Sequence, residues 1–198
     1  YLVGGSQLLH FDVTLPTDPI LLSTKSIVTS SGASAQARAV FARDSMIYVS
    51  ASDGVRVLRL DENRELREVD TIPSTVLGGE PGALDVQSST LWAVVPGARR
   101  IVAHELASGR YEQTNWVATR DLSGNAFGAT SFTFSKDLLL ASSGASGLVV
   151  AFPLRQAGAS VPAGQIATLA LVPGSPSSTK QILLGGGTLY VAAGGGDV

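Results

Sequence analysis

Residues 48–57 read Tyr48-Val49-Ser50-Ala51-Ser52-Asp53-Gly54-Val55-Arg56-Val57, and this pattern is the clearest indication of the fold. An apolar run led by an aromatic residue enters a short turn of small and polar residues and then a second apolar run, which is typical of a β-hairpin. The aromatic or aliphatic triplet recurs at five places, anchored on Tyr1, Tyr48, Trp92, Leu139 and Tyr190. Successive anchors lie about 44 to 51 residues apart, which indicates that one structural unit is repeated.

Each repeat contains four segments with strand character, and the triplet is the second of them. The predicted first strands are 37–41, 83–86, 130–134 and 181–184, the third strands are 8–13, 55–60, 101–106 and 149–154, and the fourth strands are 20–24, 65–72, 111–117 and 165–171. We interpret residues 61–64 as the hairpin turn between a third and a fourth strand. The pattern predicts an all-β fold, a β-propeller of four-stranded antiparallel blades, with about four and a quarter blades in this chain.

We predict one incomplete β-propeller domain over residues 1–198, with blade repeats near 1–46, 47–90, 91–137, 138–188 and 189–198. The chain opens on a second strand and ends where a third strand should begin. In a closed ring of four blades, residues 181–184 would complete the first blade, and residues 190–198 would then be a surplus strand with an exposed edge, which proteins avoid. We therefore expect the chain to be part of a larger ring of about six to eight blades.

Composition excludes several classes of function. Charged residues make up 15% of the 198 residues and the formal net charge is −2, so there is no electrostatic footprint for nucleic acid. The chain has no cysteine, which excludes disulfides, thiolate metal sites and a cysteine nucleophile. No apolar run approaches the roughly 18 residues that a membrane helix needs, so we expect no membrane insertion.

Residues 9–22 run from an apolar strand through Asp12 into a link that contains Pro16 and Pro19, and residues 189–192 read Leu-Tyr-Val-Ala before a glycine-rich turn. Both segments resemble the LVIVD-type and YVTN-type bacterial β-propeller repeats. The resemblance spans the chain and concerns architecture, and the second and third copies lack the proline link. It implies a propeller on an exported or cell-surface protein, and hence an extracellular, periplasmic or cell-surface location.

The motifs that could carry chemistry have simpler structural interpretations, and we predict no catalytic residue, no metal site and no cofactor. His104 aligns with an apolar column of the third strands, and no ligand set with metal-binding spacing accompanies it or His10. Residues 143–147 resemble a nucleophile elbow but have no following helix and no base. The glycine runs 185–187 and 194–196 are interpreted as hairpin turns, as are Asp44, Asp53, Asp137 and Asp197, because Asp bonds its own backbone in tight turns.

The long connections from each fourth strand to the next first strand are the more informative segments. They span 73–82, 119–129 and 172–180 and differ from one another in sequence. Binding residues concentrate on loops held by a rigid scaffold. We therefore name a candidate recognition surface, to which a protein or glycan partner would bind, made of Arg100, Arg120, Asp121, Asn125 and Phe127. The alternative is an ordinary solvated loop with Phe127 packed inward.

Trp92 and Trp116 are both expected in the core, because aromatic side chains fill the space between blades.

The first functional hypothesis is a non-enzymatic scaffold or interaction module. The second is a propeller hydrolase of the lactonase type, whose metal-binding residues would have to come from outside this segment. The third is a structural subunit of a filament or large assembly, in which a neighbouring subunit, or blades missing from this chain, cover the edge strands at its ends.

Overall fold

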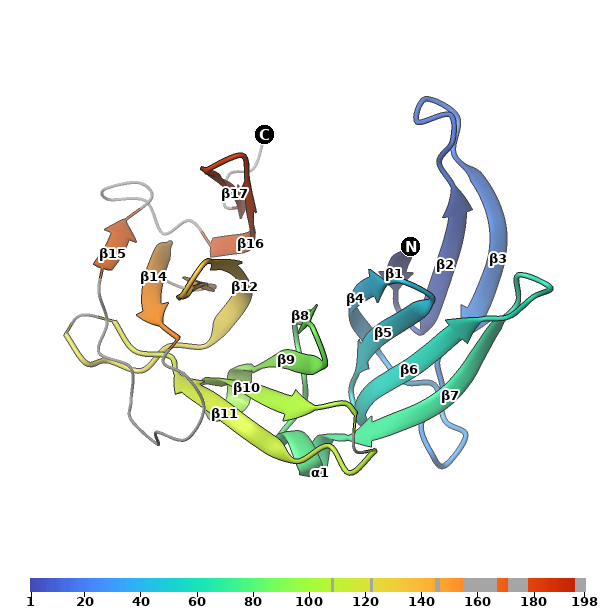
Figure 1. Ribbon diagram of the computed structural model, residues 1–198, viewed down its shortest axis with the longest axis horizontal. Coiled ribbons are helices and arrows are strands. Elements are labelled where there is room, and N and C mark those ends of the chain that lie inside the picture. Colours follow the sequence, from blue (N-terminus) through green and yellow to red (C-terminus); the bar gives the residue numbers. More distant parts are fainter. Residues whose placement is uncertain (108, 122, 145–146, 155–166, 171–177, 195–198) are drawn as a thin grey trace. The chain divides into compact units, whose positions relative to one another are not determined.

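The computed structural model describes residues 1–107, 109–121, 123–144, 147–154, 167–170 and 178–194. The chain divides into two compact units, residues 1–86 and 87–198. Each unit is built from antiparallel strands, and the neighbours in each sheet follow one another in the chain (Figure 1).

Unit 1 begins with a three-stranded sheet in the order β1-β2-β3 and continues with a four-stranded sheet in the order β4-β5-β6-β7. The first sheet comprises β1 (Leu2–Gly4), β2 (Gln7–Asp12) and β3 (Ile20–Ser26). The second comprises β4 (Ala37–Arg43), β5 (Met46–Ala51), β6 (Gly54–Leu60) and β7 (Leu66–Pro73), and the short helix α1 (Ser74–Leu77) follows it.

The unit boundary falls within β8 (Leu84–Gln87), which belongs to a sheet in the order β11-β10-β9-β8. The other members are β9 (Thr90–Val95), β10 (Arg100–Glu105) and β11 (Gln113–Ala118), and a 3₁₀ turn, η1 (Pro96–Ala98), joins β9 to β10. The next sheet has the order β12-β13-β14-β15 and comprises β12 (Ala129–Ser135), β13 (Leu138–Ser143), β14 (Leu148–Pro153) and β15 (Ala167–Ala170). A pair of strands, β16 (Ser178–Gly185) and β17 (Thr188–Gly194), ends the described chain.

These sheets confirm the predicted fold class: the chain is all-β and its sheets are propeller blades of successive antiparallel strands. Each predicted strand has its counterpart among the described residues, and the ends differ by at most three residues. Residues 165–166 and 171 of the last predicted fourth strand lie outside the described residues. The turn at 61–64 is present between β6 and β7. No helix among the described residues has the length and apolar character to cross a membrane. The single domain over residues 1–198 and its blade boundaries stay predictions.

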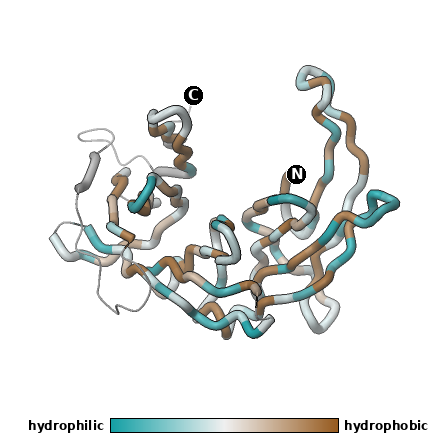
Figure 2. Tube along the Cα trace, viewed as in Figure 1, coloured by the Kyte–Doolittle hydropathy of each residue, from teal (hydrophilic) through white to brown (hydrophobic). Residues whose placement is uncertain are grey.

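The core of unit 1 lies between its two sheets. Leu8 of β2 and Ile47, Val49 and Leu58 of the second sheet are buried in one cluster. Alternation along the strands brings these side chains to one face, since successive residues of a strand point to opposite sides of a sheet. Apolar colouring accordingly follows β5 and β6, whereas the hairpin tip between β6 and β7 is hydrophilic (Figure 2).

Trp92 is a core residue of unit 2, as predicted. It is 8% exposed and its ring meets Phe134 edge-on at 5.3 Å between centroids. The prediction for Trp116 is wrong, because this side chain is 40% exposed. Its neighbour Val117 is the buried residue of β11, and alternation therefore places Trp116 on the opposite face.

Candidate functional site

The connection from β11 to β12 is a closed loop with its own hydrogen-bond ladder. The backbone N–H of Asp121 donates to the carbonyl of Asn125 at 2.9 Å, and the N–H of Gly124 donates back to the carbonyl of Asp121 at 2.9 Å. Closer to the strands, the N–H of Phe127 donates to the carbonyl of Thr119 at 2.9 Å. The Thr119 hydroxyl donates to the carbonyl of Phe127 in return. The described residues of the loop, 119–121 and 123–129, are therefore held together by hydrogen bonds to one another.

Side chains of the candidate surface take part in this closure. The carboxylate of Asp121 accepts from the backbone N–H of Asn125 at 2.9 Å and from its side-chain amide at 3.2 Å. The backbone N–H of Asn125 is the main cause that lowers the pKa of Asp121. Arg120 donates to the carbonyl of Gly124 at 2.9 Å. The side chain of Asp121 therefore closes the loop through these hydrogen bonds, and its carboxyl group is ionised at neutral pH.

The structure brings four of the five predicted residues into this loop. Arg120 and Asn125 are exposed, whereas Asp121 and Phe127 are half-buried. Arg100 is the first residue of β10, opposite Ala118, and within the described residues no hydrogen bond or ion pair joins its side chain to the loop. Of the four predicted residues in the loop, Arg120 and Asn125 are therefore the ones most open to a partner.

The same loop occurs a second time, between β3 and β4. The N–H of Thr29 donates to the carbonyl of Ala33 at 2.7 Å, the N–H of Gly32 donates back to Thr29 at 2.9 Å, and the N–H of Ala35 donates to Ile27 at 3.0 Å. The hydroxyl of Thr29 accepts from the N–H of Ala33 at 3.1 Å, which is the role of the Asp121 carboxylate. The same pattern of loop hydrogen bonds therefore occurs in two of the connections between sheets.

The two loops match residue by residue and differ in side-chain chemistry. A bridge joins Val28 to Ser34 in one and Arg120 to Ala126 in the other. The matched positions are Ile27 and Thr119, Val28 and Arg120, Thr29 and Asp121, Gly32 and Gly124, Ala33 and Asn125, and Ala35 and Phe127. One loop thus displays small and apolar side chains, and the other displays a cation, an amide and an aromatic ring on the same frame. Sequence reasoning missed this match. The signal was a Thr or Asp three residues before a glycine, as in Thr29 and Gly32 and in Asp121 and Gly124.

The other two long connections differ from this pair. The connection 73–82 contains α1, whose first N–H, that of Ser74, donates to the carbonyl of Asp53 at 2.9 Å. Leu77 is fully buried. The connection predicted at 172–180 lies outside the described residues up to residue 177, as do Asp197 and part of the glycine run 194–196.

A buried arginine that sequence reasoning did not single out, Arg56, lies on β6 of unit 1. Arg56 has a side chain 3% exposed and donates to the carbonyl of Val28 at 2.7 Å and to the Thr71 hydroxyl at 2.9 Å. It also forms an ion pair with Asp53, and Thr71 donates to Glu68 at 2.8 Å. These contacts hold the loop after β3 against β6 and β7. The signal in the sequence was a cation, Arg56, placed between Val55 and Val57 in the strand 54–60.

His104 is buried, as its alignment with the apolar column of the third strands predicted, but its Nε2 has no hydrogen-bond partner among the described residues. It is 1% exposed, and its Nδ1 lies 2.7 Å from the carbonyl of Tyr111. Burial lowers the pKa of His104, and Arg100 acts in the same direction, whereas the Tyr111 carbonyl opposes them. The ring is therefore neutral at pH 7, and its Nδ1 donates to Tyr111. His10 is half-buried and stacks on Tyr1 at 4.7 Å, and burial lowers its pKa as well.

Within the described part of the chain, no three metal-ligating side chains lie together. The candidate turns at Asp44 and Asp53 are turns in the structure. Asp44 follows β4 with a φ of 55°, in the left-handed region that Asp tolerates better than most residues. Asp53 lies between β5 and β6 and pairs with Arg56.

No protein-family model and no curated protein sequence matches the chain. Solved structures match it at low sequence identity. A chain in a crystal structure of the mitotic checkpoint complex is 12% identical with a TM-score of 0.67, and the match covers 98% of this chain and 53% of that one. A protein from Lactobacillus plantarum is 14% identical, with a TM-score of 0.66 over 88% and 54%. A putative 6-phosphogluconolactonase from Bacteroides uniformis is 17% identical, with a TM-score of 0.65 over 93% and 56%.

The fold is that of a β-propeller. The likeness to these structures supports it together with the blades described above. The chain spans about half the length of each of these three solved chains. The finer resemblance to LVIVD-type and YVTN-type repeats stays a prediction.

Proposed function

We propose that this chain is a non-enzymatic propeller module that binds a protein or glycan partner through the loop 119–129. One observation carries the proposal: the loops 27–37 and 119–129 have the same backbone hydrogen bonds but different exposed side chains. A frame that stays constant while its side chains change is the physical basis of recognition by loops on a rigid scaffold. Arg120 and Asn125 are the contact residues, and Phe127 and Arg100 contribute from the edge of the surface.

Two further considerations support a binding role. Arg and aromatic residues are enriched at the energetic centres of protein interfaces, and the loop offers one of each. A structural neighbour comes from a crystal structure of a checkpoint complex, so the same fold occurs within a protein assembly. The low charge of 15% and the few lysines, Lys25, Lys136 and Lys180, support the proposal that the protein is exported or located at the cell surface.

The test is a comparison of captured partners. The immobilised chain, an Arg120→Ala/Asn125→Ala double variant and a Val28→Ala control are each exposed to extracts and envelope fractions of the source organism and to a glycan array. Val28 holds the position equivalent to Arg120 and is 42% exposed, so its truncation controls for loss of any exposed side chain there. The proposal requires a protein or glycan that the wild type and the control retain and the double variant loses. Equal retention by all three would contradict it.

The hydrolase and the assembly subunit are separate hypotheses. One of the structural neighbours is a putative 6-phosphogluconolactonase, and that likeness concerns the fold alone. Metal analysis of the full-length protein, followed by lactonase and esterase assays, tests the hydrolase. A stoichiometric metal together with turnover would replace the binding module as the better account. Sedimentation of the purified protein tests the subunit, which requires a large assembly.

A further inference from the structure

Three arginines and a methionine form a row across the second sheet of unit 1. Arg43 of β4 is paired with Met46 of β5, Met46 with Arg59 of β6, and Arg59 with Arg67 of β7. Residues directly opposite each other on antiparallel strands have their side chains on the same face. The four side chains therefore follow one another at the end of the sheet where β4 turns into β5 and β6 turns into β7.

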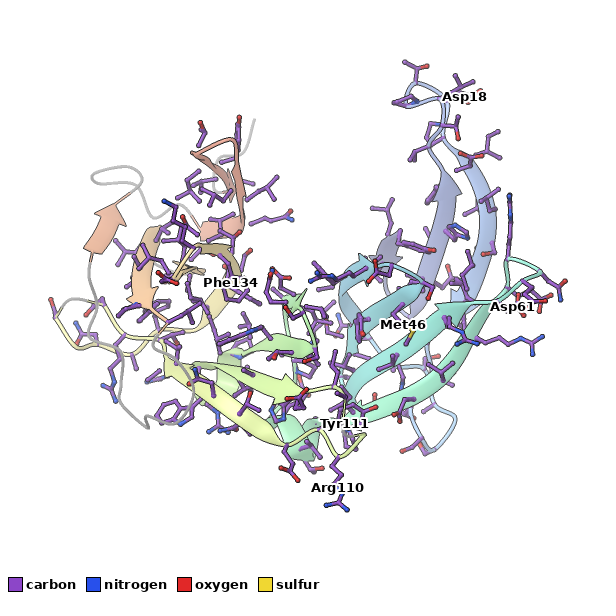
Figure 3. All side chains as sticks on the ribbon, in the orientation of Figure 1. Asp18, Met46, Asp61, Arg110, Tyr111 and Phe134 are labelled. Atoms are coloured by element: carbon purple, nitrogen blue, oxygen red, sulfur yellow. The ribbon has the colours of Figure 1, made fainter. Side chains whose placement is uncertain are left out.

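A hollow of about 500 Å³ opens at this end of the sheet. Ser45 from the β4–β5 turn, Arg59, Arg67 and the hairpin residues Asp61 and Glu62 are among the residues that line it. Figure 3 labels Met46, from the row, and Asp61, from the hairpin, both in unit 1. The loop 27–36 and the β5–β6 turn lie at the other end of these strands, because neighbouring strands run antiparallel.

The three arginines of the row differ in their hydrogen bonds and ion pairs. Arg67 pairs with Asp61 at 2.7 Å, and Asp61 also accepts the backbone N–H groups of Asn63 and Glu65 at 2.9 Å each. Arg43 donates to the carbonyl of Val86 at 2.6 Å. Arg59 is exposed, and no ion pair or hydrogen bond joins its side chain to any described residue. One guanidinium in the hollow is therefore available to a ligand.

The propeller architecture does not require arginines at these positions. The pair that corresponds to Met46 and Arg59 is Thr90 and Glu105 in the next sheet. It is Leu138 and Pro153 in the sheet after that. Like charges directly opposite each other destabilise a sheet, yet Arg59 lies opposite Arg67. Carboxylates of the hairpin pair with Arg67, whereas Arg59 has no such partner among the described residues. An arginine that the repeat does not need, and that the hairpin leaves unpaired, points to a role in binding.

We propose that this hollow binds an acidic side chain of a protein partner, with Arg59 as the anchor. A planar guanidinium accepts a carboxylate in a two-point contact, which gives both strength and direction. Small-molecule pockets are mostly apolar and enclose their ligand. This hollow is polar, open and lined by charged side chains, and it therefore suits a side chain presented by another protein surface. The site is separate from the loop 119–129 and does not depend on the function proposed for it.

The test uses a fluorescent peptide of alternating Glu and Ser, and a Gln-Ser peptide of the same length as the uncharged probe. Anisotropy titrations at low salt compare the wild-type chain with Arg59→Gln. Arg38→Gln is the matched control, because Arg38 is also a partly exposed arginine of this sheet, paired with Glu80. The wild type and the control should bind the acidic peptide alike, and Arg59→Gln should weaken binding by about tenfold, as expected for lost hydrogen bonds to a charged group. Circular dichroism checks that each variant is folded.

Two results would overturn the proposal. One is equal binding of the acidic and the Gln-Ser peptide by the wild type. The other is equal weakening by Arg59→Gln and Arg38→Gln, which would mean a diffuse charge effect. Glu62→Gln provides an independent check, because this carboxylate lines the hollow beside the proposed ligand. Its removal should strengthen binding of the acidic peptide, and weaker binding would contradict the assignment.

Discussion

Gly32 and Gly124 occupy the same position in two loops of different sheets, and both have a φ of 83°. In each loop, the glycine donates its N–H to the residue three positions earlier, Thr29 or Asp121. A left-handed backbone at this position lets the chain turn back toward its own start. The fold therefore builds two connections from one backbone pattern and varies only the side chains that the pattern displays.

Replacing either glycine with alanine should lower the free energy of unfolding by about 1 kcal/mol, the lower end of the cost of a left-handed backbone for a residue with a Cβ. An added Cβ meets no atom within 4 Å at either site, so the loss comes from the backbone alone. Urea denaturation of Gly32→Ala and Gly124→Ala measures it. Gly97→Ala is the control, because Gly97 has the same open space without a left-handed φ. An equal loss in all three variants would contradict the shared loop conformation.

Trp92→Ala should cost about 3–5 kcal/mol of unfolding free energy, because it removes a large buried aromatic side chain that packs against Phe134. Trp116→Ala, in the same unit, should cost less than about 1 kcal/mol, since that side chain is 40% exposed. Chemical denaturation of both variants gives the comparison. Similar losses would mean that the outermost strand β11 is packed on both faces.

Arg56→Met should lower the free energy of unfolding by about 3 kcal/mol, because it leaves the partly buried Asp53 and the Val28 carbonyl without their donor. Arg38→Met breaks the exposed ion pair with Glu80 and should cost less than about 1 kcal/mol. Thermal denaturation should rank the two variants in this order. The reverse order would show that the Arg56 network contributes little to the loop it contacts.

The buried histidine predicts a pH dependence of stability. Burial lowers the pKa of His104 below the ordinary value of 6.5, so the unfolded chain takes up a proton there before the folded chain does. Unfolding free energy should therefore fall as the pH drops below about 6.5. His104→Gln should make this fall shallower, and His10, whose pKa is lowered too, should retain part of it. An NMR titration in which His104 protonates at or above pH 6.5 would contradict this account.

The sequence predicted the blades because hairpin turns and a repeat of apolar triplets are local signals. It could not predict whether a given side chain is buried, because burial depends on which face of a sheet is covered by another part of the protein. Trp116 shows this: the residue type favours the core, but β11 is the last strand of its sheet, and only the face of Val117 is buried. Tyr48 and Tyr190 hold equivalent places in the repeat and yet are 7% and 58% exposed.

The candidate surface was predicted from residue types and loop length alone. That reasoning named Arg120 and Asn125, which are exposed in the structure, but it could not show that the carboxylate of Asp121 closes the loop. Nor could it reveal the row of Arg43, Arg59 and Arg67, because the row arises from register between strands. The three residues are not adjacent in the chain and lie in line only once the hairpins have formed.

The most direct test of the central claim is a loop exchange. Residues 120–127 are replaced by the sequence of residues 28–35, a segment of equal length, and both the unfolding midpoint and the capture of partners are measured. If the two loops share a backbone and differ in recognition, the variant should unfold close to the wild type and lose the partner that the wild type retains. A variant that keeps the partner, or that no longer folds, would contradict the claim that a common frame displays a specific surface.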